Sequence, residues 1–229
     1  MGERSGNYSF GVENQIHSFS LDKICYVLNT DLMHGVKNID AKVLLKVYGC
    51  NKYSRPKKNT KSKSAIKKLL PCIYSKTDWS KKDWDRVFNY RINKTYCVIR
   101  ECIKKNITGR NLVKGDIIHL ECGQIVPADI VVFQFEGCLV VDNRIITGNK
   151  FEKKSNIFTN RDFLHSENVL FAGTEILSGK CVGIVIATGN GTVFGNLTKV
   201  AQKVRLTHQS LSSFYSYSAK PASSYQTVA

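Results

Sequence analysis

The fold is decided by five blocks of sequence between Leu112 and Gly195: LVKGDII (112–118), VPADIVV (126–132), VDNRIITG (141–148), FAGTEILSG (171–179) and GIVIATGNGTVFG (183–195). Each block is a short run rich in β-branched residues that borders on Gly, Pro, Asn or Asp. This pattern is typical of short strands joined by tight turns. We therefore expect a mainly β fold with a small helical N-terminal part, and a distorted jelly roll or β-barrel as its architecture.

Turn residues punctuate these runs. Pro127 cannot donate a hydrogen bond to a neighbouring strand, so we expect it at the start or the edge of a strand. Seven glycines stand where a turn would need positive φ or a close backbone approach; they are Gly115, Gly123, Gly137, Gly148, Gly173, Gly179 and Gly189.

Two helices are expected ahead of the β domain. The first is predicted by apolar residues at i, i+3, i+4 and i+7, with Ser20 as its N-cap and Asn29 to Asp31 as its end; these residues are Leu21, Ile24, Cys25 and Leu28. The second ends at Gly49 and places on one face Ala41, Leu44, Leu45 and Tyr48.

The ordered blocks resemble the actuator domain of P-type ion-pumping ATPases. That family reads roughly V-x-G-D, P-A-D, D-x-S-x-L-T-G-E-S, F-x-G-T, S-G and A-T-G-x-x-T-x-x-G, and this chain has nearly all of these blocks in the same order. The pair Asp142-Asn143 resembles the branch of sodium/potassium and proton/potassium pumps. Residues 16–53, with Thr30-Asp31, Gly35 and GCNKY (49–53), resemble the cytosolic N-terminal segment of the same branch.

The resemblance and the composition together predict five segments. Residues 1–13 and 205–229 are expected to be disordered, and residues 14–53 form the helical segment. Residues 54–84 read as a basic, Ser-rich linker, and residues 85–204 as the actuator-like β domain. The resemblance implies two membrane helices at the place of this linker, but no run of about 18 apolar residues occurs, so no transmembrane segment is predicted.

Charge and cysteines restrict the function further. The net charge is +16, and residues 1–110 hold 23 Lys and Arg against 9 Asp and Glu, whereas residues 111–229 hold 11 against 9. The 8 cysteines are scattered without a Cys-x-x-Cys pair. This indicates reduced thiols and a cytoplasmic protein, peripheral at the membrane if its basic part binds lipid.

The loop that carries the family's hydrolytic Glu departs from the pattern. The resemblance places Thr147, Gly148, Asn149 and Lys150 at the T-G-E-S positions, so that Asn149 takes the place of the Glu that activates water. An amide can hydrogen-bond a water but cannot accept its proton near neutral pH. We therefore expect a degenerate actuator loop without catalytic residues; a surface turn with no remaining role is the simpler interpretation.

Other catalytic machinery is not expected. The chain has no Asp-Lys-Thr-Gly-Thr phosphorylation motif, and we expect no nucleotide domain. The GNGT sequence (189–192) lacks the Lys of a phosphate-binding loop, so it is interpreted as a hairpin turn between two strands. The 5 histidines are isolated, which predicts no metal site and no cofactor.

A basic patch offers a second interpretation. We expect this patch to bind an anionic membrane surface; a nucleic acid is the less favoured partner. Trp79 and Trp84 would support nucleic-acid binding by stacking on bases, although a local aromatic pair explains them as well. The patch consists of Lys52, Arg55, Lys57, Lys58, Lys61, Lys63, Lys67 and Lys68.

The leading hypothesis is a truncated relative of a sodium/potassium-type P-type ATPase. It would not be an enzyme on its own, and it would have a regulatory or interaction role in cation transport beside a full-length pump or one of its domains. A gene remnant with little function fits the same residues. The alternative is the basic module that binds nucleic acid or anionic membrane; an active, membrane-embedded pump would require the absent helices.

Overall fold

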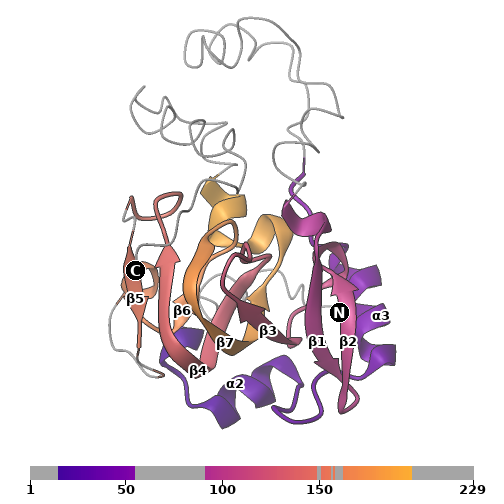
Figure 1. The fold of residues 1–229 in the computed structure, drawn as a ribbon. Helices are drawn as coiled ribbons and strands as arrows, with labels where there is room; N and C mark the ends of the chain where they lie inside the picture. Colours follow the sequence, from indigo (N-terminus) through magenta and orange to yellow (C-terminus); the bar gives the residue numbers. More distant parts are fainter. Residues whose placement is uncertain (1–14, 55–90, 149–150, 156, 158–161, 198–229) are drawn as a thin grey trace, which may run out of the picture. The chain divides into compact units, whose positions relative to one another are not determined.

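The computed structural model describes residues 15–54, 91–148, 151–155, 157 and 162–197 (Figure 1). Within it, residues up to Ser54 and residues 91–196 belong to one compact unit. The helical segment and the β-rich segment therefore pack together across a long gap in sequence.

A single antiparallel sheet forms the body of this unit (Figure 1). Its strand order is β2-β1-β3-β7-β4-β5, and β6 pairs with β4 off this path. The expected mainly β fold with a small helical N-terminal part is confirmed. The strands are β1 (Thr95–Arg100), β2 (Ile103–Thr108), β3 (Ile117–Glu121), β4 (Asp129–Asp142), β5 (Glu152–Lys154), β6 (Val169–Leu170) and β7 (Glu175–Ala187).

The long strands β4 and β7 bend because their pairing is interrupted. The register shifts between Asp129 and Ile130, between Val132 and Gln134, and between Glu136 and Val140. Such bulges increase local twist and turn a flat sheet into a curved one. Gly179 lies at this bend with φ of +80°, and a Cβ there would stand 2.7 Å from the Cys138 carbonyl oxygen.

The glycine prediction is confirmed at every position. Positive φ is found at Gly115, Gly123, Gly137, Gly148, Gly173, Gly179 and Gly189. Pro127 lies two residues before β4, where its missing N–H is not needed by the sheet. Five of these glycines lie outside the strands, whereas Gly137 and Gly179 lie inside β4 and β7, where the register shifts.

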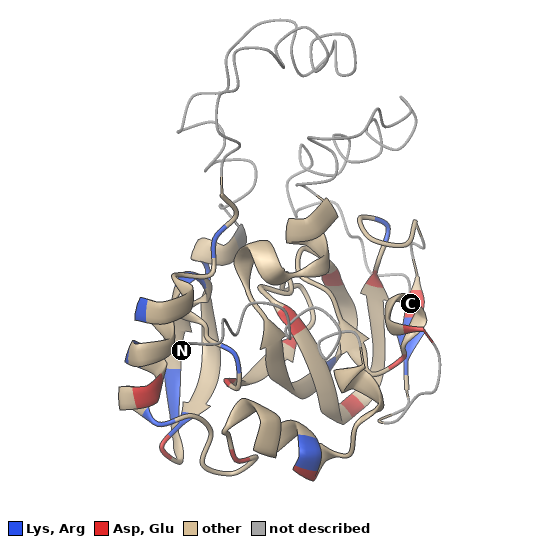
Figure 2. Ribbon diagram, turned by 180° about the vertical axis from the view of Figure 1, so that it is seen from behind, with Lys and Arg blue, Asp and Glu red and all other residues tan. Residues whose placement is uncertain are grey.

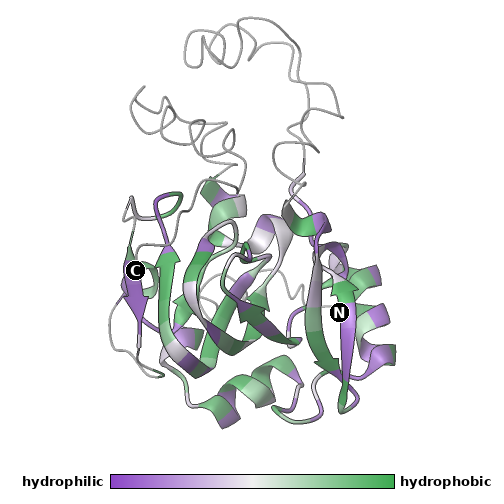
Figure 3. Cartoon of the chain, viewed as in Figure 1, coloured by the Kyte–Doolittle hydropathy of each residue, from purple (hydrophilic) through white to green (hydrophobic). Residues whose placement is uncertain are grey.

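Two clusters of buried apolar residues pack on the sheet, and Figure 3 shows hydrophobic residues along its strands. One cluster includes Tyr96, Ile118, Ile130, Leu139 and Val185. The other lies beneath the N-terminal segment, where Ile16 and Ile24 pack on Ile117, Phe171 and Ile184. The N-terminal segment is thus part of the core rather than an appendage.

The two predicted helices are present. Helix α2 (Leu21–Leu28) is capped by Ser20, whose Oγ accepts a hydrogen bond from the Lys23 N–H, and it ends at Asn29 in left-handed conformation. A short 3-10 turn, η1 (Ile16–Ser18), precedes it. Helix α3 (Asn38–Tyr48) ends at Gly49 as expected.

The predicted inner face of α3 needs one correction. Ala41 is buried, and Leu44 and Leu45 pack against the Val36–Val113 cluster. Tyr48, however, is 68% exposed. It belongs to the last helical turn, and its ring faces the Lys114 ammonium at 5.8 Å instead of entering the core.

A buried ion pair joins β1 to the turn before β3. The Arg100 guanidinium donates to both carboxylate oxygens of Asp116 at 2.6 Å each, and the Val113 N–H donates to the same carboxylate. Burial raises the pKa of the Asp116 carboxyl, while its bonds to Arg100 and Val113 oppose the shift. Removal of one partner would leave the other charge buried and unpaired.

The sequence GNGT was assigned wrongly. Residues Gly189–Gly191 form the 3-10 turn η7, and residues 193–197 are helical, so this is not a hairpin between two strands. No strand follows β7 in the described residues, and the segment instead binds residues 51–54. Residues 198–204, the end of the predicted β domain, lie outside the described part.

Several expectations concern residues that are not described. These are the terminal segments 1–13 and 205–229, the linker 55–84, and the two tryptophans Trp79 and Trp84. In the described residues no helix is long and apolar enough to cross a membrane. The described cysteines are all free thiols, and burial raises the pKa of Cys181 to about 12.

The β1–β2 hairpin provides a test of this fold. Its two-residue turn places Glu101 and Cys102 at φ of 54° and 62°, a conformation that favours Asn-Gly. Glu101 compensates, since its carboxylate accepts from the Asn38 N–H at 3.0 Å and so caps α3. We expect Cys102→Gly to raise the free energy of unfolding by about 0.5–1 kcal/mol, because glycine removes the left-handed strain.

Glu101→Gly is the matched control in the same turn. It relieves the same kind of strain but removes the helix cap, which is worth about 1 kcal/mol, so little or no net gain is expected. Chemical denaturation of both variants measures the difference. Equal stabilisation by the two variants would contradict the capping role of Glu101.

Candidate functional site

The candidate site is the turn that follows β4. Both the Ile146 N–H and the Thr147 N–H donate to the Asn143 carbonyl oxygen at 2.9 Å, and the Thr147 hydroxyl approaches the same oxygen at 3.4 Å. Gly148 continues the turn with φ of +85°. We call residues 142–148 the actuator loop; its backbone folds back on Asn143.

An ion pair holds the start of this loop. The Arg144 guanidinium donates to the Asp142 carboxylate through Nε at 3.1 Å and through Nη2 at 2.8 Å, and the Arg144 N–H donates to the same group. Asp142 is buried, whereas the Arg144 side chain is 38% exposed. Because one partner remains in contact with water, the pair restrains the loop more than it stabilises the fold.

A buried lysine lies beneath the loop. The Asn143 side-chain amide donates to the Glu152 carboxylate, which also accepts from the Lys154 ammonium at 2.6 Å. The ammonium donates in addition to the Ser166 carbonyl oxygen at 2.7 Å. Burial lowers the pKa of Lys154, and Glu152 opposes that shift. This chain of contacts fixes Asn143 and joins the loop to β5.

The blocks PAD and FAGT meet beside the loop. The Asp129 carboxylate accepts from the Ala172 N–H at 2.8 Å and from the Val193 N–H at 2.7 Å. It therefore ties the turn at residues 171–174 to the segment after η7. A Cβ on Gly173 would stand 3.6 Å from Ile145 Cδ1, so this turn lies directly against the actuator loop.

The end of the N-terminal segment is bound to the same region. The Asn51 side-chain amide donates to the carbonyl oxygens of Gly109 and Pro127 at 2.8 and 2.9 Å, and its carbonyl oxygen accepts from the Gly189 N–H at 2.6 Å. The ring of Tyr53 packs edge-on against Phe194 at 5.0 Å. One buried side chain thus connects three loops of the β domain.

The predicted site residues are only partly described. Thr147 and Gly148 lie at the end of the actuator loop; Thr147 is half-buried and Gly148 is exposed. Asn149 and Lys150 lie outside the described residues, so their positions stay predictions. Of the basic patch, the structure describes Lys52, which is exposed, and no other member.

Sequence reasoning missed the residues that support the loop. Arg144 occupies the Ser position of the family pattern, and that departure was a usable signal. Asn51 is part of the block GCNKY, but the sequence does not indicate its contacts with three distant loops. For Glu152 and Lys154 the sequence carries no local signal, because their role depends on contacts with distant residues.

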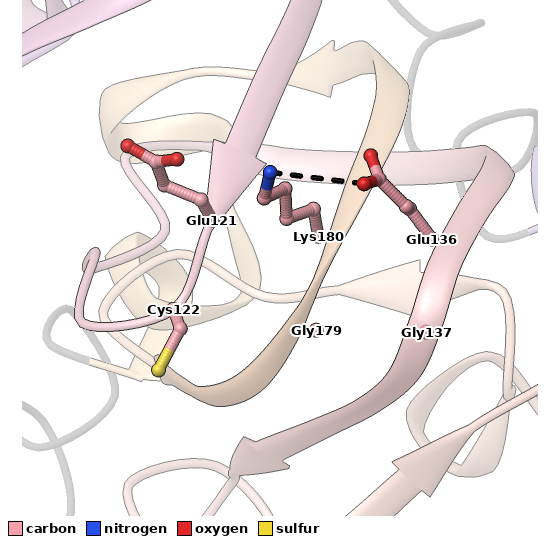
Figure 4. A pocket seen from close by; sticks show the side chains of 6 residues that line it. All are labelled: Glu121, Cys122, Glu136, Gly137, Gly179 and Lys180. Atoms are coloured by element: carbon pink, nitrogen blue, oxygen red, sulfur yellow. Dashed lines mark ion pairs between the residues drawn. The ribbon is translucent and has the colours of Figure 1, made fainter.

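A shallow pocket lies apart from the actuator loop (Figure 4). It has a volume of about 390 Å³ and is lined by Glu121, Cys122, Glu136, Gly137, Gly179 and Lys180. Lys180 pairs with Glu136 at 3.7 Å, and the Cys122 thiol donates to the Leu177 carbonyl oxygen at 3.0 Å. Of the lining side chains, Lys180 and Glu136 therefore pair within the pocket, and Cys122 is bonded to a backbone carbonyl outside it.

Metal chemistry finds no support in the described part of the chain. No group of three or more His, Cys, Asp or Glu side chains there could hold a metal ion. The prediction of no metal site concerns the whole chain and stays a prediction.

The β domain matches a known protein family. The family description that matches residues 91–202 is the P-type ATPase actuator domain, and these residues include the whole sheet and the actuator loop. Residues 91–202 therefore match the actuator domain of the P-type ATPases, which is not the domain that phosphorylation modifies.

The relatives identify the branch. Potassium-transporting ATPase alpha chain 2 of Homo sapiens is 38% identical over 118 residues, which are 51% of this chain and 11% of that protein. Sodium/potassium-transporting ATPase subunit alpha-2 is 31% identical over 156 residues in Gallus gallus and in Rattus norvegicus, which are 68% of this chain and 13% of each relative. The predicted resemblance to this branch is confirmed, and the chain matches about a tenth of the length of these relatives.

Arg144 allows a direct test of the loop. We expect Arg144→Ser, which restores the family residue, to release the loop from Asp142 and to speed amide exchange at Ile146 and Thr147. The free energy of unfolding should fall by less than about 1 kcal/mol, since the pair is partly exposed. Lys153→Ser, on the exposed side of β5, is the control. Unchanged exchange in Arg144→Ser would show that the pair does not restrain the loop.

Proposed function

We propose that this chain is a non-catalytic actuator module that associates with a P-type cation-transporting ATPase and regulates it. The observation that carries the proposal is the sequence Thr147-Gly148-Asn149-Lys150 at the end of a structurally supported actuator loop. The support beneath the loop is retained, but the residue at the Glu position cannot act as a base.

The contacts around the loop favour an interaction role over a turn with no function. Asp142 and Asn143 are buried. Glu152 and Gly173 contact the loop from outside, and the Asp142–Arg144 ion pair restrains it from within. A loop that is held in place can present residues 147–150 to a partner without a large loss of conformational entropy.

The partner follows from the family. In a pump the actuator loop meets a phosphorylated aspartate in another domain, so a module of this kind would compete for that surface or occupy it. Lys150 would add a positive charge close to the acyl phosphate, while Asn149 would hold water without deprotonating it. The module would then slow turnover by prolonging the phosphorylated state. We place it in the cytoplasm, at or near the membrane that holds the pump.

Co-purification tests the association. The full 229-residue chain, carrying an affinity tag, should capture a sodium/potassium-type pump from detergent-solubilised membranes. A variant with Asn149→Ala and Lys150→Ala should capture less, if the loop contributes to the interface. Failure to retain any P-type ATPase under conditions that preserve known pump assemblies would exclude the proposed partner.

A loop graft tests the chemistry. Replacement of the corresponding T-G-E-S residues of a full-length pump by residues 147–150 should leave phosphorylation by ATP intact and slow dephosphorylation by about 10²–10⁴-fold, because no general base remains. The phosphorylated enzyme would accumulate in a quench experiment with labelled ATP.

The control for the graft restores Glu at the position of Asn149. Most of the turnover should return, which assigns the defect to the missing base rather than to the shape of the loop. Normal turnover of the unreverted graft would refute the argument about water activation. Loss of phosphorylation itself would show that this loop does not fit the pump's geometry.

A further inference from the structure

A row of exposed aliphatic residues runs along α3. Ile39, Val43 and Val47 are 73%, 52% and 67% exposed, and their spacing of four residues places them on one side of the helix. Lys42 and Lys46 form a parallel row beside them and are also exposed. We call these five residues the α3 outer face; Figure 3 shows that α3 carries both hydrophobic and hydrophilic residues.

The fold does not account for these aliphatic residues. The opposite side of α3 supplies the core contacts through Ala41, Leu44 and Leu45. Ile and Val have lower helix propensity than the residues usual on an exposed helix surface. At these positions they therefore add no stability through burial and do not favour the helix through their propensity. This indicates a contact outside this unit.

The charge around the α3 outer face is positive. Lys37, Lys42 and Lys46 are exposed on or next to α3, and Figure 2 shows basic residues on this helix. In the described residues the ammonium groups of Lys42 and Lys46 pair with no carboxylate. The neighbouring carboxylate of Glu101 is already occupied by Asn38 at the start of the helix. Asp40 is the one acidic residue within α3, and it is half-buried.

From these observations we propose that the α3 outer face docks on an anionic lipid surface. An exposed helix face with aliphatic residues next to lysines is the pattern of interfacial helices: the aliphatic residues enter the boundary between headgroups and acyl chains. The lysines extend their ammonium groups to anionic headgroups, each contributing to binding. A groove of a protein partner would favour the aliphatic row but would not require the lysines.

Vesicle binding by the full chain tests the proposal. Sedimentation with phosphatidylcholine vesicles is compared with sedimentation with vesicles that also contain phosphatidylserine. We expect binding to the anionic vesicles only. The combined variant Ile39→Ser, Val43→Ser and Val47→Ser should lower the partition coefficient at least about tenfold, because the apolar contribution is lost while every charge in the chain is kept.

A matched control removes exposed apolar side chains elsewhere. Tyr26→Ser with Val27→Ser acts on α2, where the two residues are 87% and 44% exposed, and should leave vesicle binding within about twofold of the wild type. Circular dichroism melting checks that the α3 variant remains folded. Lys42→Glu with Lys46→Glu should likewise weaken binding to anionic vesicles at least about tenfold.

The outcomes separate this proposal from the proposed function. Vesicle binding by the α3 variant that equals the wild type overturns the proposal, whatever the pump experiments show. Loss of pump capture in the α3 variant, together with unchanged vesicle binding, also overturns it and assigns the α3 outer face to a protein. No pump is present in the vesicle assay, so failure of the pump association leaves its result unaffected.

Discussion

The buried side-chain amide of Asn51 connects three loops of the β domain to the end of the N-terminal segment. It is the point at which the N-terminal segment meets the β domain, and it satisfies two carbonyl oxygens and one N–H that belong to three different loops. A buried polar group without its partner costs free energy on the order of 1–3 kcal/mol. Asn51 prevents that cost at three places. Together with the apolar packing of Ile16 and Ile24 on the sheet, it joins residues 15–54 and 91–196 in one unit.

The position of the actuator loop depends on this junction through a short series of contacts. Asn51 holds Pro127, and two residues later Asp129 holds both Ala172 and Val193. The turn that contains Ala172 lies against Ile145 of the loop. From the other side, Glu152 and Lys154 hold Asn143. The actuator loop is therefore positioned from two sides by contacts that begin outside it.

Local features were predictable from the sequence, and contacts between distant residues were not. The positive φ of Gly137 and Gly179, and the capped helix α2, follow from steric and hydrogen-bonding preferences of single residues. The 3-10 turn η7 was mistaken for a hairpin because the sequence GNGT fits both, and only its contacts with Asn51 and Ser54 distinguish them. Tyr48 lies at a position that matches the apolar period of α3. The period does not show whether the neighbouring surface extends far enough to bury the last residue of the helix. The buried state of Lys154 likewise depends on Ser166 and Glu152, which no local pattern indicates.

The central claim is that the two segments form a single cooperative unit through Asn51. Amide hydrogen exchange on the full chain, with Asn51→Ala compared with Lys52→Ala, tests it most directly. The account predicts that Asn51→Ala lowers protection together in α3, in β1 and β2, and in η7, by about 100-fold for a loss of roughly 3 kcal/mol. Lys52→Ala should change none of these. Loss of protection confined to residues next to position 51, with α3 and η7 unchanged, would contradict the claim.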